Sequence, residues 1–536
     1  MKFQTQAALE PKIWKIGTRE YDIDCWNQMK MQNMKTKILI TITQDYSIIY
    51  SKDGQILRIQ QFSNYEEPEI LTNLELIKHF KCQIQSRNDQ EKFVRQTATW
   101  YGTPLQEVCG YFEGGLKQGI WSQTFKNYRS QAEIYEVGEY YNDVKNGQWK
   151  YIYKNKIIGG GKYNENQQKD GKWIDLSESF MDQSQVTYIG DYSNGKKVGR
   201  WDINWNWDEQ NLQIGGGSYK DEQHSSTKIG MWIELVDNFR WDSQVIYKGE
   251  YKNGQKIGRW DIMYKRNDNF ELIGGGQFDD KNGISIKIGR WIELSNFFSD
   301  YSQVTYEGFY KEGHKVGRWD NFLKFGGKNE LIGGGQYVDD AEQNNIKIGM
   351  WIELWDEFKK DSQIIYKGEY KNGQKIGRWD ILYRRNDRFR QIGGGQYDEC
   401  LQEGLKKIGK WIELSEGFYD YSQVIQTGEY INGFKFGRWD VLYRQKMSDQ
   451  FEQIGGGLYE NDKEIGAIKV GKWIELSDEF KWDSQFIYTG EYKNANKVGI
   501  WDEMVRDRNN IEAGFQKMQI KYNIKTQKSK EIQYDN

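Results

Sequence analysis

Hydrophobic and polar residues alternate over most of the chain, and short turn sequences interrupt the alternation. In residues 245–262, Tyr247 and Tyr251 precede an Asn253-Gly254 pair, and a second alternating run follows it. Alternation places one set of side chains on each face of a strand. Asn-Gly between two such runs predicts a two-residue type I′ turn, because both central residues need positive φ. The segment is therefore predicted to be a β-hairpin.

The predicted turn also sets the register of this hairpin. Four pairs are expected on one face: Tyr251 with Lys256, Gly249 with Gly258, Tyr247 with Trp260, and Val245 with Ile262. The opposite face is mostly charged. Glycine in a strand often marks a close approach of another group. We therefore expect the glycine pair to leave room for tyrosine and tryptophan rings.

Internal repeats extend this hairpin through most of the chain. The 247–262 sequence recurs almost unchanged at 366–381, and a second segment, IGGGQY followed by KIGRWIELS, alternates with it. The tryptophans near the segment ends are 28 residues apart within a pair and 24 to 34 residues apart between pairs. This spacing predicts about fourteen hairpins in seven pairs. The variable loops (279–286, 338–346 and 398–406) are where the array would distinguish partners.

The turn sequence changes in some sister units. Asn-Gly recurs at 194–195, 372–373 and 432–433, whereas Asn142-Asp143, Glu312-Gly313 and Asn494-Ala495 replace it elsewhere. We expect these three turns to be weaker or of another type.

The predicted fold is all-β: an elongated antiparallel meander of tandem hairpins, forming a twisted single-sheet rod or solenoid. Residues 101–515 form the array, and 516–536 a polar tail. Residues 1–75 contain a hairpin candidate with strands at 37–43, 47–51 and 56–62. Residues 76–100 are expected to be a helical or degenerate cap, because 69–85 has the pattern of a short amphipathic helix.

Composition supports this fold and narrows the function. All three prolines lie before residue 105, and proline-free sequence rich in tyrosine and tryptophan suits continuous sheet. The net charge is −3, with acidic and basic residues interspersed, so no nucleic-acid partner is predicted. The four cysteines have no metal or disulfide spacing. No signal peptide or transmembrane segment is recognised, which predicts an intracellular protein, cytoplasmic or associated with the cytoskeleton.

The pattern YxGEYKNGxKxGxW resembles the MORN repeat, especially the alternating arrays of ciliate-type MORN proteins. The residues that carry the resemblance are Tyr247, Gly249, Tyr251, Asn253, Gly254, Gly258 and Trp260, with Trp201, Trp319, Trp379 and Trp439 at the same place in sister units. The histidine that usually precedes the second glycine is absent, and the units are longer. The resemblance implies an extended hairpin array that acts as a scaffold in cytoskeletal, ciliary or cortical assemblies. It also implies phosphoinositide binding as an alternative.

Repeated charged residues are the candidate chemistry. Aspartates follow the GRW motif, glutamates lie in WIEL, and arginines precede the tryptophan: Asp202, Asp261, Asp320, Asp380 and Asp440; Glu234, Glu293, Glu353, Glu413 and Glu475; Arg200, Arg259, Arg318, Arg378 and Arg438. Identical carboxylates in every unit argue against a single active site, so cross-strand ion pairs are expected. The arginine row is the weak candidate for phosphate or lipid contacts.

The remaining motifs favour structural roles. The triple glycines precede strand-like residues rather than a helix, unlike a phosphate-binding loop. The three histidines (His79, His224, His314) are scattered. No catalytic, cofactor or metal site and no small-molecule substrate are predicted. The tryptophans are expected to pack in the core or between repeats rather than to stack on a ligand. A single-layer sheet would expose its aromatic face, so we expect curling of the sheet on itself, a second copy or a protein partner to cover it.

Overall fold

The computed structural model describes residues 16–27, 32–52, 55–61, 70–85, 93–221, 225–266, 269–338, 345–356, 358–385, 387–399, 406–415, 418–445, 450–462, 466–477, 480–493, 495–507, 513–517, 519–521 and 531–533. The chain divides into two compact units. The first contains Met1–Ile273 and Asp280–Ser285, and the second contains Gly274–Asp279 and Ile286–Asn536.

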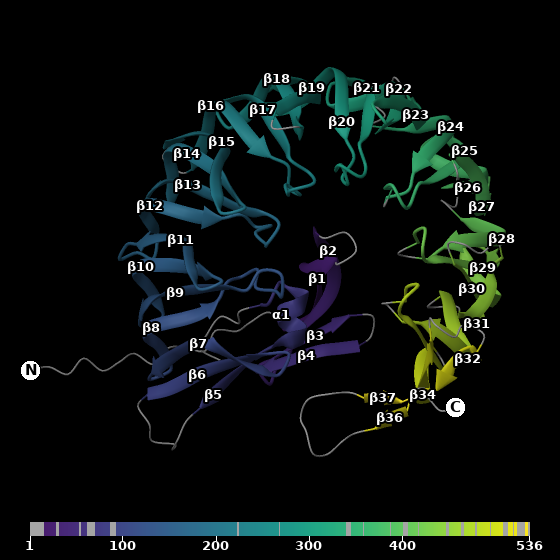
Figure 1. Cartoon of the computed structure of the whole chain (residues 1–536), viewed down its shortest axis with the longest axis horizontal. Helices are drawn as coiled ribbons and strands as arrows, with labels where there is room; N and C mark the ends of the chain where they lie inside the picture. The colour runs from purple at the N-terminus through teal and green to yellow at the C-terminus, as the bar shows by residue number, and fades with distance from the viewer. Residues whose placement is uncertain are drawn as a thin grey trace, which may run out of the picture. The chain divides into compact units, whose positions relative to one another are not determined.

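The first unit begins with a four-stranded antiparallel sheet in the order β1-β2-β3-β4 (Figure 1). Its strands are β1 (Gly17–Asn27), β2 (Gln32–Ile42), β3 (Ser47–Lys52) and β4 (Gln55–Gln61). Buried isoleucines such as Ile23 and Ile48 pack with Ile77 of helix α1 (Leu74–His79). The three strands expected here correspond to β2, β3 and β4, whereas β1 was not predicted. Residues 53–54, between β3 and β4, lie outside the described residues.

The helix predicted over 69–85 is wrong in its second half. The Asn73 side chain caps α1 by accepting from the backbone N–H groups of Glu75 and Leu76. After His79 the chain becomes β5 (Phe80–Gln85), which pairs with β6 (Phe93–Trp100). Apolar residues in 80–85 occupy alternate positions, which suits a strand better than a helix. In the described part of the chain, no helix has the length and apolar character needed to cross a membrane.

The repeat array is an antiparallel meander in which consecutive strands pair in chain order, as predicted. In the first unit its strands are β7 (Thr103–Glu113), β8 (Leu116–Thr124), β9 (Ile134–Tyr141), β10 (Val144–Tyr153), β11 (Lys156–Tyr163), β12 (Lys169–Leu176), β13 (Gln185–Ser193), β14 (Lys196–Trp207), β15 (Gln210–Asp221), β16 (Ser226–Leu235), β17 (Val245–Lys252) and β18 (Gln255–Arg266). Strand β19 (Asn269–Lys281) has residues in both units, and the strand that follows it begins with two residues of the first unit, Ile284 and Ser285.

The second unit continues the same pattern of hairpins. Its strands are β20 (Ile284–Leu294), β21 (Val304–Lys311), β22 (His314–Phe325), β23 (Lys328–Tyr337), β24 (Lys347–Leu354), β25 (Ile364–Lys371), β26 (Gln374–Arg385), β27 (Arg388–Tyr397), β28 (Lys407–Leu414), β29 (Gln423–Ile431), β30 (Phe434–Arg444), β31 (Glu452–Asp462), β32 (Gly466–Leu476), β33 (Gln485–Lys493), β34 (Asn496–Arg506) and β35 (Gln516–Lys517). In the predicted polar tail, β36 (Gln519–Lys521) pairs with β37 (Glu531–Gln533).

The β17–β18 hairpin has the predicted turn but not the whole predicted register. Asn253 and Gly254 have φ of 49° and 77°, as a type I′ turn requires, and Tyr251 pairs with Lys256. Beyond that pair, one residue of β17 lies against three of β18, so Tyr247 pairs with Ile262 and Val245 with Tyr264. The predicted pairs of Tyr247 with Trp260, Gly249 with Gly258 and Val245 with Ile262 are therefore wrong.

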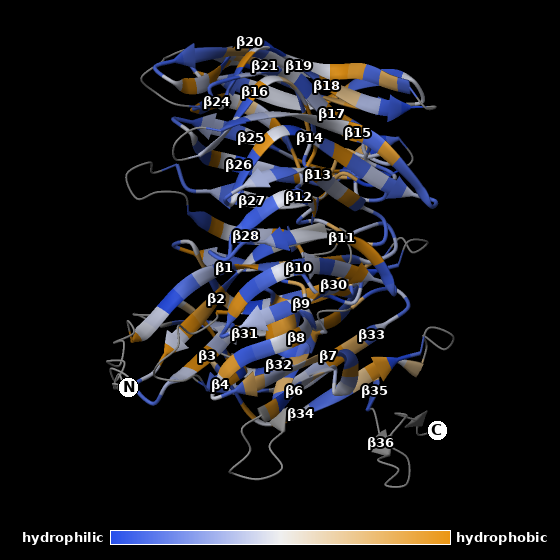
Figure 2. Ribbon diagram, turned by 90° about the vertical axis from the view of Figure 1, so that its left-hand side faces the viewer, coloured by the Kyte–Doolittle hydropathy of each residue, from blue (hydrophilic) through white to orange (hydrophobic). Residues whose placement is uncertain are grey.

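A bulge at Gly258 causes this register shift. Gly258 has φ of +63°, and a Cβ added to Gly249 would be 2.3 Å from the Trp260 ring. The ring thus lies over the glycine of the opposite strand. Because the shift is two residues, each side chain keeps its face. Hydrophobic and hydrophilic residues therefore still alternate in bands along the strands (Figure 2).

Two of the three divergent turns keep the same backbone conformation. Asn142 and Asp143 have φ of 49° and 65°, and Glu312 and Gly313 have φ of 50° and 84°. The expectation of another turn type is wrong for these two. At the third divergent turn, Asn494 lies outside the described residues. The predicted variable loop 279–286 is a hairpin tip whose turn is Asn282-Gly283. The other two predicted loops lie largely outside the described residues.

Candidate functional site

The arginine and aspartate rows pair within one strand. Arg259 Nε donates to Asp261 Oδ1 over 2.7 Å, two residues further along β18. The same pair recurs as Arg200–Asp202, Arg318–Asp320, Arg378–Asp380 and Arg438–Asp440. Cross-strand partners expected for these aspartates are therefore replaced by in-strand ones. The arginine side chains are about half exposed, and each carries its counter-charge beside it.

The WIEL glutamates are centres of a more buried network. Glu353 binds Lys347 of its own strand, accepts from the Tyr370 hydroxyl at 2.8 Å, and pairs with Lys375 at 2.8 Å. Equivalent networks surround Glu234, Glu293, Glu413 and Glu475. Two lysines from different strands thus share one carboxylate, which confirms the expectation of ion pairing for these glutamates.

The lysines make the carboxylates of this network more acidic. Burial acts to raise the pKa of Glu353, but Lys375 and Lys347 outweigh burial and lower it. The neighbouring tyrosine responds in the opposite sense. Burial and Glu353 both raise the pKa of Tyr370. The network therefore holds a carboxylate that stays charged and a phenol that stays neutral.

The tryptophans of the aromatic face are buried, as packing between repeats requires. Tyr370 meets Trp379 edge to face with ring centroids 5.3 Å apart, and Trp351 meets Tyr370 at 6.0 Å. Lys375 Nζ lies 4.1 Å from the Trp379 ring centroid. Trp379 is only 1% exposed. Glycine backbone on one side, lysine on the other and tyrosine edges between them cover the tryptophans, so this face requires no partner.

A cavity of about 950 Å³ opens in the first unit where the four-stranded sheet approaches the early repeats. Asp24, Lys35 and Thr72 line it from the N-terminal side. The array contributes side chains from β9 to β14 and from the loops after β8, β12 and β16: Phe125, Lys126, Asn127, Glu136, Tyr151, Tyr163, Lys169, Asp175, Leu176, Ser177, Glu178, Ser179, Ser184, Val186, Tyr188, Lys197, Leu235, Val236, Asp237 and Phe239. A cavity of this size suits a small molecule.

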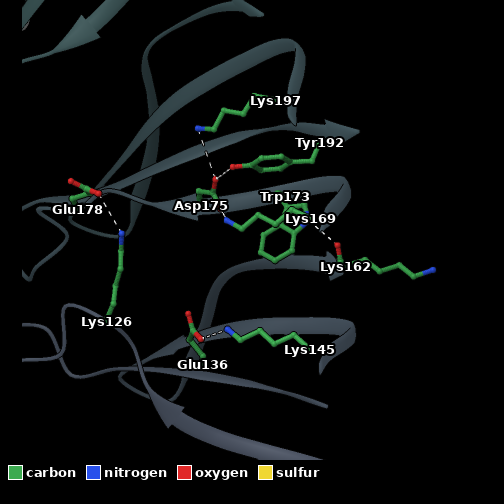
Figure 3. A network of polar contacts seen from close by, with 10 residues as sticks. All are labelled: Lys126, Glu136, Lys145, Lys162, Lys169, Trp173, Asp175, Glu178, Tyr192 and Lys197. Atoms are coloured by element: carbon green, nitrogen blue, oxygen red, sulfur yellow. Dashed lines mark hydrogen bonds and ion pairs between the residues drawn. The ribbon is translucent and has the colours of Figure 1, made fainter. Parts of the chain in front are cut away.

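Ion pairs organise this cavity (Figure 3). Lys145 pairs with Glu136 at 2.7 Å, and Lys126 with Glu178 at 3.3 Å. Asp175 binds Lys169 and accepts from the Tyr192 hydroxyl at 2.7 Å. These side chains come from separate hairpins. The edge-to-face contacts between tryptophan and tyrosine rings of neighbouring strands, here called the tryptophan–tyrosine ladder, hold these hairpins in place relative to one another.

Three residues of the cavity depart from the repeat consensus. Glu136 occupies the position of Tyr247, Tyr151 that of Ile262, and Asp175 that of Glu234. Sequence reasoning treated the repeats as equivalent and missed this cluster. Aligning the units and marking the departures would have identified all three residues.

The structure describes two of the three scattered histidines. His79 stacks on Tyr101 with ring centroids 3.7 Å apart, His314 lies in β22, and His224 is outside the described residues. Within the described ranges, no cluster of three or more histidine, cysteine, aspartate or glutamate side chains has the geometry of a metal site.

Comparisons with known proteins do not identify a relative. No protein-family model and no curated protein sequence match the chain. One similar solved chain belongs to a S. cerevisiae structure described as dbp5 bound to nup159, gle1, IP6 and ADP. It is 7% identical, with a TM-score of 0.16, and the match covers 70% of this chain and 84% of that chain. A TM-score this low supports no statement about fold or function.

Proposed function

We propose that the protein is a non-enzymatic, MORN-type scaffold that binds protein partners, in a cytoskeletal, ciliary or cortical assembly. One surface carries this proposal, the apolar patch formed by Ile431, Phe434, Phe436 and Leu458 on β29, β30 and β31. These side chains are between 39% and 48% exposed. Ile431 pairs with Phe434 across the hairpin, and Leu458 pairs with Arg438 on the next strand.

The apolar patch replaces polar residues of a sister unit. Where this patch has Ile431, Phe434 and Leu458, the preceding pair of hairpins has Lys371, Gln374 and Gln396. The fold therefore does not require apolar side chains at these positions. Clustered exposed apolar residues mark interaction sites more often than single ones.

The sister unit supplies the test. The triple variant Ile431→Lys, Phe434→Gln, Leu458→Gln carries the side chains of the sister unit. It should therefore fold like the wild type but lose binding of the protein partner. Proximity labelling in the native cell would measure partner loss, and sedimentation velocity would measure self-association. The matched control is Lys371→Arg with Gln374→Asn and Gln396→Asn, which keeps the sister surface polar. Unchanged labelling and sedimentation in the triple variant would contradict binding at this patch.

The phosphoinositide adaptor has weaker support. Its candidate arginines are exposed, but each is paired with an aspartate two residues away. The adaptor requires binding to phosphoinositide vesicles that weakens with salt. Replacement of Arg259, Arg318 and Arg378 by Ala without loss of such binding would exclude the arginine row as its basis.

A further inference from the structure

Asp175 is shorter by one methylene than the glutamates that occupy its position in later repeats, and its ion pairs differ accordingly. The second lysine of each later network lies 2.8 to 3.1 Å from its glutamate, in the pairs Lys256–Glu234, Lys315–Glu293, Lys375–Glu353, Lys435–Glu413 and Lys497–Glu475. The equivalent Lys197 lies 3.9 Å from Asp175. The short carboxylate therefore does not reach Lys197 within hydrogen-bond distance.

The oxygen nearest to Lys197 is already engaged. Tyr192 donates to Asp175 Oδ2, the same oxygen that lies 3.9 Å from Lys197 Nζ. In the Glu353 network, Tyr370 uses Oε1 and leaves Oε2 to Lys375. Burial lowers the pKa of Lys197, and Asp175 offsets this only in part. Burial likewise lowers the pKa of Lys435, so the feature peculiar to Lys197 is its distance from the carboxylate.

Lys197 also lines the cavity, together with the three residues that depart from the consensus. Its Nζ lies 4.0 Å from the Trp201 ring centroid and 5.5 Å from that of Tyr188, which fixes its direction. Phe125 and Phe239 provide apolar surface in the same cavity. The other lysines there, Lys35, Lys126 and Lys169, have closer carboxylate partners in Asp24, Glu178 and Asp175.

We propose that this cavity binds a small organic anion whose carboxylate or phosphate group pairs with Lys197. The anion supplies the oxygen that a glutamate supplies in the later repeats. The aromatic and apolar side chains of the lining contact the body of the ligand. This site is independent of the apolar patch on β29 to β31.

Isothermal titration calorimetry of the full chain with inorganic phosphate and with benzoate tests the site. The wild-type protein should bind one or both probes saturably. Lys197→Gln should weaken binding by about tenfold or more, because it removes a charge-assisted hydrogen bond. Asp175→Glu should weaken binding similarly, because the longer carboxylate would occupy Lys197. Lys256→Gln is the matched control and should leave the affinity unchanged.

The outcomes separate clearly. Binding of phosphate alone assigns a phosphorylated ligand, and binding of benzoate alone assigns a carboxylic acid; both support the site. If Lys197→Gln fails to fold by circular dichroism, Asp175→Glu decides, since it restores the arrangement of the sister repeats. Absence of saturable binding to the wild type overturns the proposal. Equal affinities of Asp175→Glu and wild type, or equal weakening by Lys256→Gln, also overturn it.

Discussion

The networks around Asp175 and Glu353 each join a carboxylate, two lysines and a tyrosine at the same repeat positions, but the aspartate is shorter and leaves its second lysine in a different state. Around Glu353, two lysines and a tyrosine satisfy both carboxylate oxygens. Around Asp175, the second lysine remains 3.9 Å away and faces a cavity. In an array of this kind each unit serves as a control for the others. Residues that recur in every repeat show what the fold needs. Residues that differ from the other repeats show where a further function has been added.

Loss of a ladder tryptophan should have the largest effect and should be similar in both units. Trp149→Ala and Trp379→Ala each remove a ring that is 1% exposed. We expect each to lower the free energy of unfolding by about 4 kcal/mol. Denaturant unfolding with hydrogen exchange on each unit would measure this. Tyr141→Ala, at a side chain that is 66% exposed, should cost less than about 0.5 kcal/mol. A much smaller loss at Trp149 would show that the ladder is weaker beside the cavity.

Neutralising the carboxylates should separate the two networks. Glu353→Gln leaves Lys347 and Lys375 without their shared anion and should cost about 2 kcal/mol of unfolding free energy. Asp175→Asn should cost about 1 kcal/mol, because Lys197 depends on Asp175 less. Thermal and denaturant unfolding would compare them, with Glu369→Gln on the exposed face as control. Equal losses of unfolding free energy in the two variants would mean that the longer distance between Lys197 and Asp175 does not weaken their interaction.

Lengthening the short carboxylate should stabilise the protein slightly. Asp175→Glu allows the carboxylate to reach Lys197 as Glu353 reaches Lys375. The gain should be about 0.5 kcal/mol, the usual size of a partly exposed ion pair. A shift of the denaturation midpoint would report it, with Glu353→Asp as the reverse exchange. If both exchanges destabilise, packing rather than ion pairing decides which residue is favoured.

Acid should act on the two units unequally. The lysines lower the pKa of Glu293, Glu353, Glu413 and Glu475 in the second unit despite burial. Their contribution is present above the ordinary value of 4.5 and is lost as the pH falls through the lower folded-state pKa. In the first unit, lysines lower the pKa of Glu234 in the same way, but burial raises the pKa of Glu75, which acts in the opposite sense. Hydrogen exchange followed below pH 4.5 should therefore show the second unit opening first. The reverse order would contradict this assignment.

The hairpins could be predicted from the sequence because their signals are local. Asn253-Gly254 identifies the turn, and alternation identifies the two faces. The bulge at Gly258 could not be predicted from alternation, because a two-residue slip preserves every face. It depends on the fit of Trp260 over Gly249, which is a contact between strands.

The cavity depended on information that no single repeat contains. Asp175 and Glu136 carry no signal by themselves. They stand out only when they are compared with the residues at the same position in the other repeats. The approach of the N-terminal sheet to the early hairpins is a tertiary contact without a local signal. Packing of the tryptophans between repeats was predicted, but the residues that cover them were not, since lysine from one strand and glycine from another provide the cover.

The glycine beneath each tryptophan has a consequence for how the chain folds. Gly249 and Trp260 are separated by eleven residues, and Gly276 and Trp291 by fifteen. Contacts this close in sequence close small loops at low entropic cost, so each hairpin should form before the array is complete. Because each hairpin contains its own glycine–tryptophan contact, the array can grow by duplication of a pair of hairpins. It also creates a hazard: 247–262 and 366–381 are nearly identical, so strands of one hairpin can pair with the wrong sister during refolding.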